Sequence, residues 1–248
     1  MDETVDALVL KQVDYGEADL IVTVLTKEYG KMSFRARGAR RMKSRNAGKI
    51  LPCMKSQFRF DLREGKTMFI LKGVNSLKTY PSLHGDLAKS AGGSLVAEVA
   101  DAMSMGDPAI DSVVFSLVET AWDMVEEGKD IVSVICLFLC DVMRLHGIAP
   151  QVDGCVRCGC PKVVAISARE GGFLCDACSN LEPRNTFALR RFRMFVKGGL
   201  HYADKIMPIA NGNLGDVETL AEMIHYHIGI KIKTLALFIR LFGVEKNA

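Results

Sequence analysis

The chain has 248 residues, of which 49% are hydrophobic and 25% are charged, and its net charge is +3. This composition excludes a disordered or fibrous chain. The start, MDETVDALVL, lacks the basic and apolar regions of a secretion signal. The most apolar stretch, Ile131 to Met143, is shorter than the roughly 20 residues that span a bilayer. We therefore expect a cytoplasmic protein without a membrane segment.

The first 80 residues contain short runs of Val, Ile, Leu and Phe separated by turn residues, a pattern typical of β-strands. Five strands are predicted, at Asp6–Val13, Asp19–Leu25, Lys31–Ala36, Pro52–Leu62 and Thr67–Ser76. Five short strands favour a small barrel, and the OB-fold is the common five-stranded barrel that binds nucleic acid. An SH3-like barrel would give the same pattern. We expect residues 1–80 to form an OB-like β-barrel.

The third predicted strand and the loop after it, Gly38–Ile50, are strongly basic. Between Tyr29 and Phe60 there is no Asp or Glu. Lys and Arg on a barrel are typical of a groove that binds the phosphate backbone of a nucleic acid. Their contacts with phosphate release counterions and so supply affinity that does not depend on base sequence. The predicted DNA-binding residues are Arg35, Arg37, Arg40, Arg41, Lys43, Arg45 and Lys49. The competing interpretation is a solvated loop without a partner.

Aromatic residues near this block divide into core and surface positions. Phe34 lies on the strand face opposite the arginines, and Phe58 and Phe60 share one face of their own strand. These three are predicted core residues. Tyr15 and Tyr29 lie at turns and are candidates for base stacking, although ordinary exposed tyrosines fit these positions equally well.

After Tyr80 apolar residues recur at helical spacing, beginning with the run from Leu83 to Met103. Further helices are predicted at Ile110–Glu127, Asp130–His146, Thr186–Val196, Val217–Ile228 and Lys231–Phe242. We expect a helical domain in two parts, residues 81–150 and 183–248. Cys136 and Cys140 lie one turn apart on an apolar helix and are predicted core residues.

Two CxxC pairs separate the two helical parts. They are Cys155, Cys158, Cys175 and Cys178, and their spacing matches the zinc-ribbon template. Four thiolates fill the tetrahedral shell of Zn²⁺ and leave no position for water, so the predicted ion is structural. Cys160 competes with Cys158 as the second ligand, and the CxxC spacing favours Cys158. Residues 151–182 are thus predicted to form a zinc-binding module around a short hairpin, which makes the whole chain an α+β multidomain protein.

Together the barrel pattern, the helical body and the inserted cysteines resemble the RecO family of bacterial recombination mediators. The similarity is greatest in Tyr15 to Val22, Leu25 to Lys31, Arg37 to Arg41 and Lys43 to Arg45, whereas Cys160 departs from the family's four-cysteine pattern. The resemblance implies binding of single- and double-stranded DNA and annealing without ATP. It also implies cooperation with RecR and single-strand-binding protein in loading RecA during DNA repair and recombination, at the bacterial nucleoid.

A second basic group follows the cysteines. Arg190, Arg191 and Arg193 share a predicted helix with Leu189, Phe192 and Phe195. A cationic rim beside apolar residues suits the tail of single-strand-binding protein, which is acidic and ends in apolar residues. We predict these three arginines as its binding site. A polar helix face or an extension of the DNA surface explains the same residues.

No catalytic motif is present in the sequence. It contains no Walker A sequence, no G-x-S-x-G and no H-E-x-x-H. A zinc deaminase would need an H-x-E or C-x-E element ahead of a P-C-x-x-C pair, and none of the five histidines supplies it. We therefore expect no enzymatic activity. The alternative function is a zinc-ribbon protein of transcription or translation, which would not need the five-strand pattern.

Overall fold

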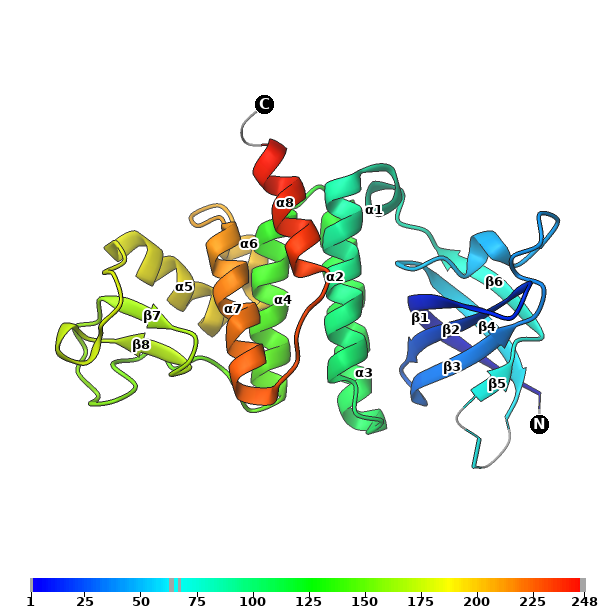
Figure 1. Ribbon diagram of the computed structural model, residues 1–248, viewed down its shortest axis with the longest axis horizontal. Helices are drawn as coiled ribbons and strands as arrows, with labels where there is room; N and C mark the ends of the chain where they lie inside the picture. The colour runs from blue at the N-terminus through cyan, green and yellow to red at the C-terminus, as the bar shows by residue number, and fades with distance from the viewer. Residues whose placement is uncertain (1, 63–64, 67, 246–248) are drawn as a thin grey trace. The chain divides into compact units, whose positions relative to one another are not determined.

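A computed structural model of the protein describes residues 2–62, 65–66 and 68–245. Within these residues the chain is α+β, with a six-stranded sheet followed by helices (Figure 1). It divides into two compact units, Met1–Glu126 and Glu127–Ala248. The boundary falls inside the predicted helical segment 81–150, because the first three helices group with the sheet. The predicted turn residues Arg63 and Glu64 and the predicted strand start at Thr67 lie outside the described residues.

The sheet has the strand order β5-β3-β2-β1-β4-β6. Its strands are β1 (Asp2–Tyr15), β2 (Asp19–Thr26), β3 (Gly30–Ala36), β4 (Lys55–Asp61), β5 (Met68–Ile70) and β6 (Gly73–Lys78). All neighbours are antiparallel except β3 and β5. The prediction of five strands was wrong at the fifth, which is two strands separated by Leu71 and Lys72. These two strands lie at opposite ends of the strand order.

The link between β5 and β6 shows that the sheet is curled. The Leu71 N–H donates to the carbonyl of Arg35 in β3 at 3.1 Å, and the Lys72 N–H donates to that of Arg59 in β4 at 2.9 Å. Adjacent residues therefore bond to strands that are not neighbours in the sheet, so the sheet curls into a half-barrel that brings β3 and β4 close. Inside it the fully buried rings of Phe34 and Phe58 lie 5.0 Å apart.

Phe60 is also fully buried in this core, which confirms all three predicted core phenylalanines. Cys53 is buried as well, but it occupies a turn with φ of +58° and not the strand that we predicted from Pro52.

Three helices complete the first unit: α1 (Pro81–Gly85), α2 (Leu87–Met103) and α3 (Pro108–Glu126). Helix α2 contacts β1, and α3 contacts β2 and β3. The buried carboxylate of Asp111 in α3 accepts the Lys31 N–H at 3.0 Å. Gly30 has a φ of +64°, and a Cβ there would lie 2.5 Å from this carboxylate. The turn before β3 is thereby fixed to α3.

The second unit is built around α4 (Ile131–Leu145), whose residues from Ile131 to Met143 are all buried. It packs against α5 (Thr186–Gly198) and α7 (Leu214–Ile228), and Figure 1 shows α4 and α7 side by side. The unit also contains α6 (Ala203–Ile206) and α8 (Leu235–Glu245). Cys136 and Cys140 are buried as predicted, and burial raises the pKa of both thiols.

A short hairpin lies between α4 and α5 in the chain, formed by β7 (Ala165–Ser167) and β8 (Gly172–Leu174). This confirms the predicted hairpin between the two cysteine pairs. Phe173 of β8 lies 6.1 Å from Phe192 of α5, measured between ring centroids, so the hairpin packs on that helix. Among the described helices none is long and apolar enough to cross a membrane.

Candidate nucleic-acid interface and metal centre

The basic loop, Gly38–Ile50, is a series of turns anchored at both ends. Ala39 and Ile50 are buried in the barrel core. The Gly38 N–H donates to the Asp19 carboxylate at 2.8 Å, and the Arg40 N–H donates to the Ala18 carbonyl at 2.9 Å. Beyond these anchors, i to i+3 hydrogen bonds close successive turns, and the loop ends in a short 3-10 helix, Ala47–Lys49. The loop therefore has a defined conformation, held by Asp19 of β2 at its start and by Ser56 of β4 at its end.

Three of the seven predicted DNA-binding residues already have partners. Arg35 pairs with Asp19 at 2.7 Å, Arg40 pairs with Asp14 at 3.1 Å, and Lys49 donates to the Val74 carbonyl at 3.2 Å. The Gly38 N–H and the Arg35 guanidinium together hold the pKa of Asp19 below its ordinary value. This aspartate therefore stays ionised and keeps Arg35 occupied.

The other four predicted residues have no ion pair among the residues that the structure describes. They are Arg37, Arg41, Lys43 and Arg45, and all four are exposed. Each can reorient towards an anion without giving up a protein partner. The structure thus separates the predicted set into three cations engaged within the protein and four that face solvent.

The two candidate stacking tyrosines differ in their surroundings. Tyr15 is 47% exposed, and the Arg35 guanidinium lies 4.9 Å from the centre of its ring. Tyr29 is 37% exposed and meets Phe60 edge-on at 6.4 Å. Tyr15 therefore shares a surface with Arg35 of β3, whereas Tyr29 contacts a phenylalanine of the barrel core.

The cysteine cluster brings together the four predicted ligands. The Sγ atoms of Cys155, Cys158, Cys175 and Cys178 all lie within 4.8 Å of one another, and those of Cys158 and Cys175 are 3.6 Å apart. Tetrahedral zinc with Zn–S bonds of about 2.3 Å places its sulfurs about 3.8 Å apart. Cys160 lies outside the cluster, with its Sγ 3.9 Å from the Lys162 carbonyl. The cluster therefore has the donor set and the size that a tetrahedral metal ion requires.

Both CxxC pairs form tight turns. In the first, Gly159 has a φ of +74° and its N–H donates to the Cys155 carbonyl at 2.8 Å. The second is a 3-10 turn, Asp176–Cys178. Backbone N–H groups, that of Cys175 above all, lower the pKa of Cys155 to about 6. This favours the thiolate of Cys155, whereas the hydrogen bond with the Cys158 thiol raises the pKa of Cys178 to about 12.

Arg157 joins the two turns. It donates to the Cys178 carbonyl at 3.2 Å and pairs with Glu170, in the hairpin turn, at 2.7 Å. On the other side of the hairpin, a Cβ at Gly172 would overlap the carbonyl of Gln151. The cysteine pairs and the hairpin are thus held together by protein contacts as well as by any bound ion.

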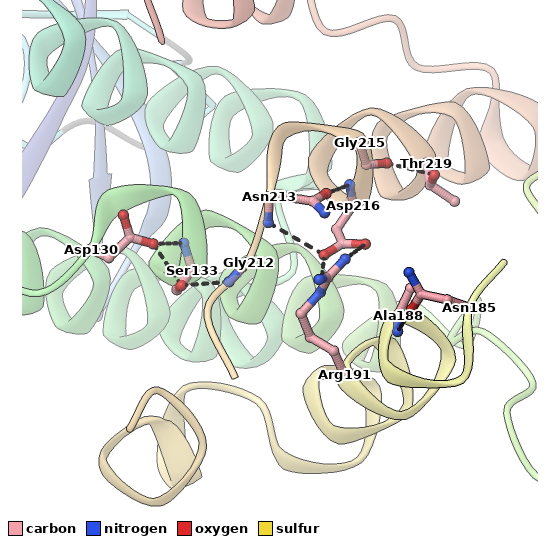
Figure 2. A network of polar contacts seen from close by, with 10 residues as sticks. All are labelled: Asp130, Ser133, Asn185, Ala188, Arg191, Gly212, Asn213, Gly215, Asp216 and Thr219. Atoms are coloured by element: carbon pink, nitrogen blue, oxygen red, sulfur yellow. Dashed lines mark hydrogen bonds and ion pairs between the residues drawn. The ribbon is translucent and has the colours of Figure 1, made fainter. Parts of the chain in front are cut away.

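The predicted partner-binding arginines of α5 do not form one surface. Arg191 is 8% exposed, and it makes two hydrogen bonds to the Asp216 carboxylate of α7, at 2.7 and 3.1 Å. Figure 2 shows this pair beside the Asn213 side chain, which caps α7. The prediction that Arg191 contacts a partner was wrong, because its side chain joins α5 to α7 inside the unit. Its spacing from Ala188 and Phe195, three and four residues away, places it on the buried helix face and could have indicated this.

Arg190 and Arg193 stay at the surface. Arg193 donates to the Val152 carbonyl at 2.7 Å and pairs with Asp153 at 2.8 Å. Both arginines line a cavity of about 350 Å³ between α5 and the cysteine module, whose apolar walls include Leu189 and Phe173. A cationic rim beside an apolar hollow is therefore present, but it is made by two arginines rather than three.

Comparison with known proteins agrees with these features. The family model described as "Recombination protein O N terminal" matches residues 1–80, and the one described as "Recombination protein O C terminal" matches residues 84–236. The DNA repair protein RecO of Anaeromyxobacter sp. (strain K) is 31% identical over 234 residues, which cover 91% of each chain. That of Rubrobacter xylanophilus is 32% identical over 185 residues, covering 73% of each. The chain therefore belongs to the RecO family of DNA repair proteins.

Proposed function

We propose that this protein is a non-enzymatic mediator of DNA repair and homologous recombination that acts on DNA at the bacterial nucleoid. It binds single- and double-stranded DNA, anneals complementary strands without ATP, and helps to load RecA onto strands coated with single-strand-binding protein. The observation that carries the proposal is the basic loop. Four exposed cations that form no ion pair with any described residue extend from the curled sheet, which we interpret as an OB-like barrel.

The chemistry of this loop suits strand annealing. Two complementary strands repel each other through their phosphates, whereas pairing itself is favourable and needs no energy input. Lys and Arg contacts to phosphate release counterions and do not depend on base sequence. Arg37, Arg41, Lys43 and Arg45 can therefore hold a strand of any sequence and lower its repulsion for the complement.

We propose that the cysteine cluster holds one structural Zn²⁺. Cys155, Cys158, Cys175 and Cys178 supply four thiolates, which complete the coordination shell and leave no position for a substrate. The ion would fix the hairpin, and through the contact of Phe173 with Phe192 it would also stabilise the outer face of α5.

The cavity beside α5 is the site that we propose for the tail of single-strand-binding protein. Arg190 would bind its carboxylates together with Arg193, whose half-exposed pair with Asp153 would open on binding, and Leu189 and Phe173 would receive its apolar end. Arg191 takes no part, because it is committed to Asp216. RecR is a further proposed partner, to which we assign no surface.

Annealing of two labelled complementary oligonucleotides in the absence of nucleotide tests the proposal. The wild-type protein should accelerate annealing, and the variant carrying Arg41→Ala, Lys43→Ala and Arg45→Ala should lose most of this acceleration. A control variant with Arg169→Ala, Lys205→Ala and Lys231→Ala removes the same charge from exposed positions of the second unit and should behave as wild type. Equal annealing by both variants would contradict the assignment of the loop. A nuclease or ATPase activity that one point mutation abolishes would overturn the non-enzymatic role.

A further inference from the structure

Met42 is the most exposed large apolar side chain among the described residues. Its relative exposure is 104%, compared with 78% for Met105 and 70% for Leu87. The Ser44 N–H donates to the Arg41 carbonyl at 2.9 Å and so closes a turn in which Met42 and Lys43 are the two central residues. Since the ends of the basic loop are anchored, this turn holds the Met42 side chain in solvent.

The turn itself has no structural requirement for methionine at this position. Turn corners favour Gly, Pro, Asn, Asp and Ser, each of which supplies a backbone angle or a hydrogen bond. Met42 contributes neither, and its full exposure shows that it packs against no described residue. The side chain therefore gains its contacts only when something binds the loop.

The charges around Met42 restrict what that partner can be. Arg40, Arg41, Lys43 and Arg45 surround it in sequence, with no acidic residue between Tyr29 and Phe60. A partner must therefore present dense negative charge and, directly beside it, a flat apolar surface. A nucleic acid strand has this combination in every nucleotide, because each phosphate is followed by a base with two apolar faces.

We propose that Met42 inserts between adjacent bases of a bound single strand while the neighbouring cations hold the phosphates on either side. The inference rests on the proposed DNA-binding role of the basic loop. Apolar side chains, methionine among them, act as wedges that unstack neighbouring bases in other DNA-binding proteins. The polarisable thioether makes favourable contacts with aromatic rings. Such a contact does not depend on base identity, because every base has a flat face.

A fluorescent oligonucleotide in which 2-aminopurine alternates with adenine tests this wedge. Stacking on a neighbouring base quenches the fluorescence of 2-aminopurine. Because every second base is fluorescent, unstacking is detected wherever along the strand the protein binds. Saturating wild-type protein should raise the emission, and Met42→Ala should abolish that rise. We expect the variant to bind about fivefold more weakly, which corresponds to about 1 kcal/mol, with an unchanged dependence of binding on salt because no charge is lost. Met42→Leu should retain the rise in emission.

Met105→Ala is the matched control, since Met105 is also highly exposed but has no cluster of cations around it. It should behave as wild type in both measurements. If Met42→Ala binds and unstacks the strand as wild type does, the wedge is disproved while the basic loop keeps its proposed role. Weaker binding with an undiminished rise in emission also disproves it. If the Arg41, Lys43 and Arg45 triple variant binds DNA as wild type does, the loop assignment fails, and the wedge fails with it.

Discussion

The basic loop and helix α5 contain the same kinds of cationic residue but use them in opposite ways. In the loop, Arg41, Lys43 and Arg45 are exposed and have no ion pair among the described residues. On α5, Arg191 is buried against Asp216, and Arg193 is held by Asp153 and by the Val152 carbonyl. The number of positive charges therefore does not predict which are free to bind an anion. The apolar positions and carboxylates around each charge decide it.

Removal of the proposed zinc should have the largest effect, and it should disturb the cysteine module and the ion pairs that α5 makes with it. We expect Cys175→Ala to abolish stable zinc binding, because it removes one of the four thiolates of the cluster. Structural zinc contributes on the order of 10 kcal/mol to the folding of small zinc domains. Residues 151–182 should therefore lose protection from hydrogen exchange, and Arg193 and Lys197 should lose their pairing with Asp153.

Mass spectrometry would measure the zinc content of the variant, and hydrogen exchange would measure the loss of protection in residues 151–182. The control is Cys160→Ala, which should keep one zinc per chain because Cys160 lies outside the cluster. Equal zinc content in the Cys175 and Cys160 variants would show that the cluster does not hold the ion.

The buried pair of α5 and α7 gives the next largest effect. Arg191→Ala leaves the Asp216 carboxylate buried without its partner, and such a loss costs about 3–5 kcal/mol of unfolding free energy. Urea denaturation followed by circular dichroism measures the change. The neighbouring Arg190→Ala is the control, since Arg190 is exposed and its loss should change stability by about 0.5 kcal/mol or less. Similar stability of the two variants would mean that the pair contributes little to the fold.

The sequence predicted well what depends on local pattern. Alternating residues located β1 to β4 within a few residues, and the CxxC spacing alone selected the four cysteines that meet in space. Prediction from sequence failed where a contact between residues far apart in the chain decides the secondary structure or the burial of a side chain. The apolar run from Met68 to Val74 looks like one strand, because its division depends on hydrogen bonds from Leu71 to β3 and from Lys72 to β4. In the same way, the burial of Arg191 depends on Asp216, which lies 25 residues away.

Asp14 of β1, which pairs with Arg40 of the loop, offers a smaller test. It pairs with Arg40 at 3.1 Å and is largely exposed, so the pair contributes at most about 1 kcal/mol to stability. Asp14→Asn should leave folding unchanged but release Arg40 for phosphate. Binding of a single strand should become tighter, and the log-log salt slope should grow steeper by about 0.7. Asp6→Asn, a change of the same kind on the same strand, should have no such effect. A wild-type slope in Asp14→Asn would indicate that Arg40 does not reach the DNA.

In the proposed function the basic loop, and not α5, supplies the phosphate contacts. The most direct measurement compares the log-log salt dependence of single-strand binding for two triple variants, by fluorescence anisotropy. Arg41→Ala, Lys43→Ala and Arg45→Ala should flatten the slope by about two, at about 0.7 for each lost contact. Arg190→Ala, Arg193→Ala and Lys197→Ala should leave it at the wild-type value. An unchanged slope in the folded loop variant, with a flattened slope in the α5 variant, would contradict the account and move the DNA-binding surface to α5.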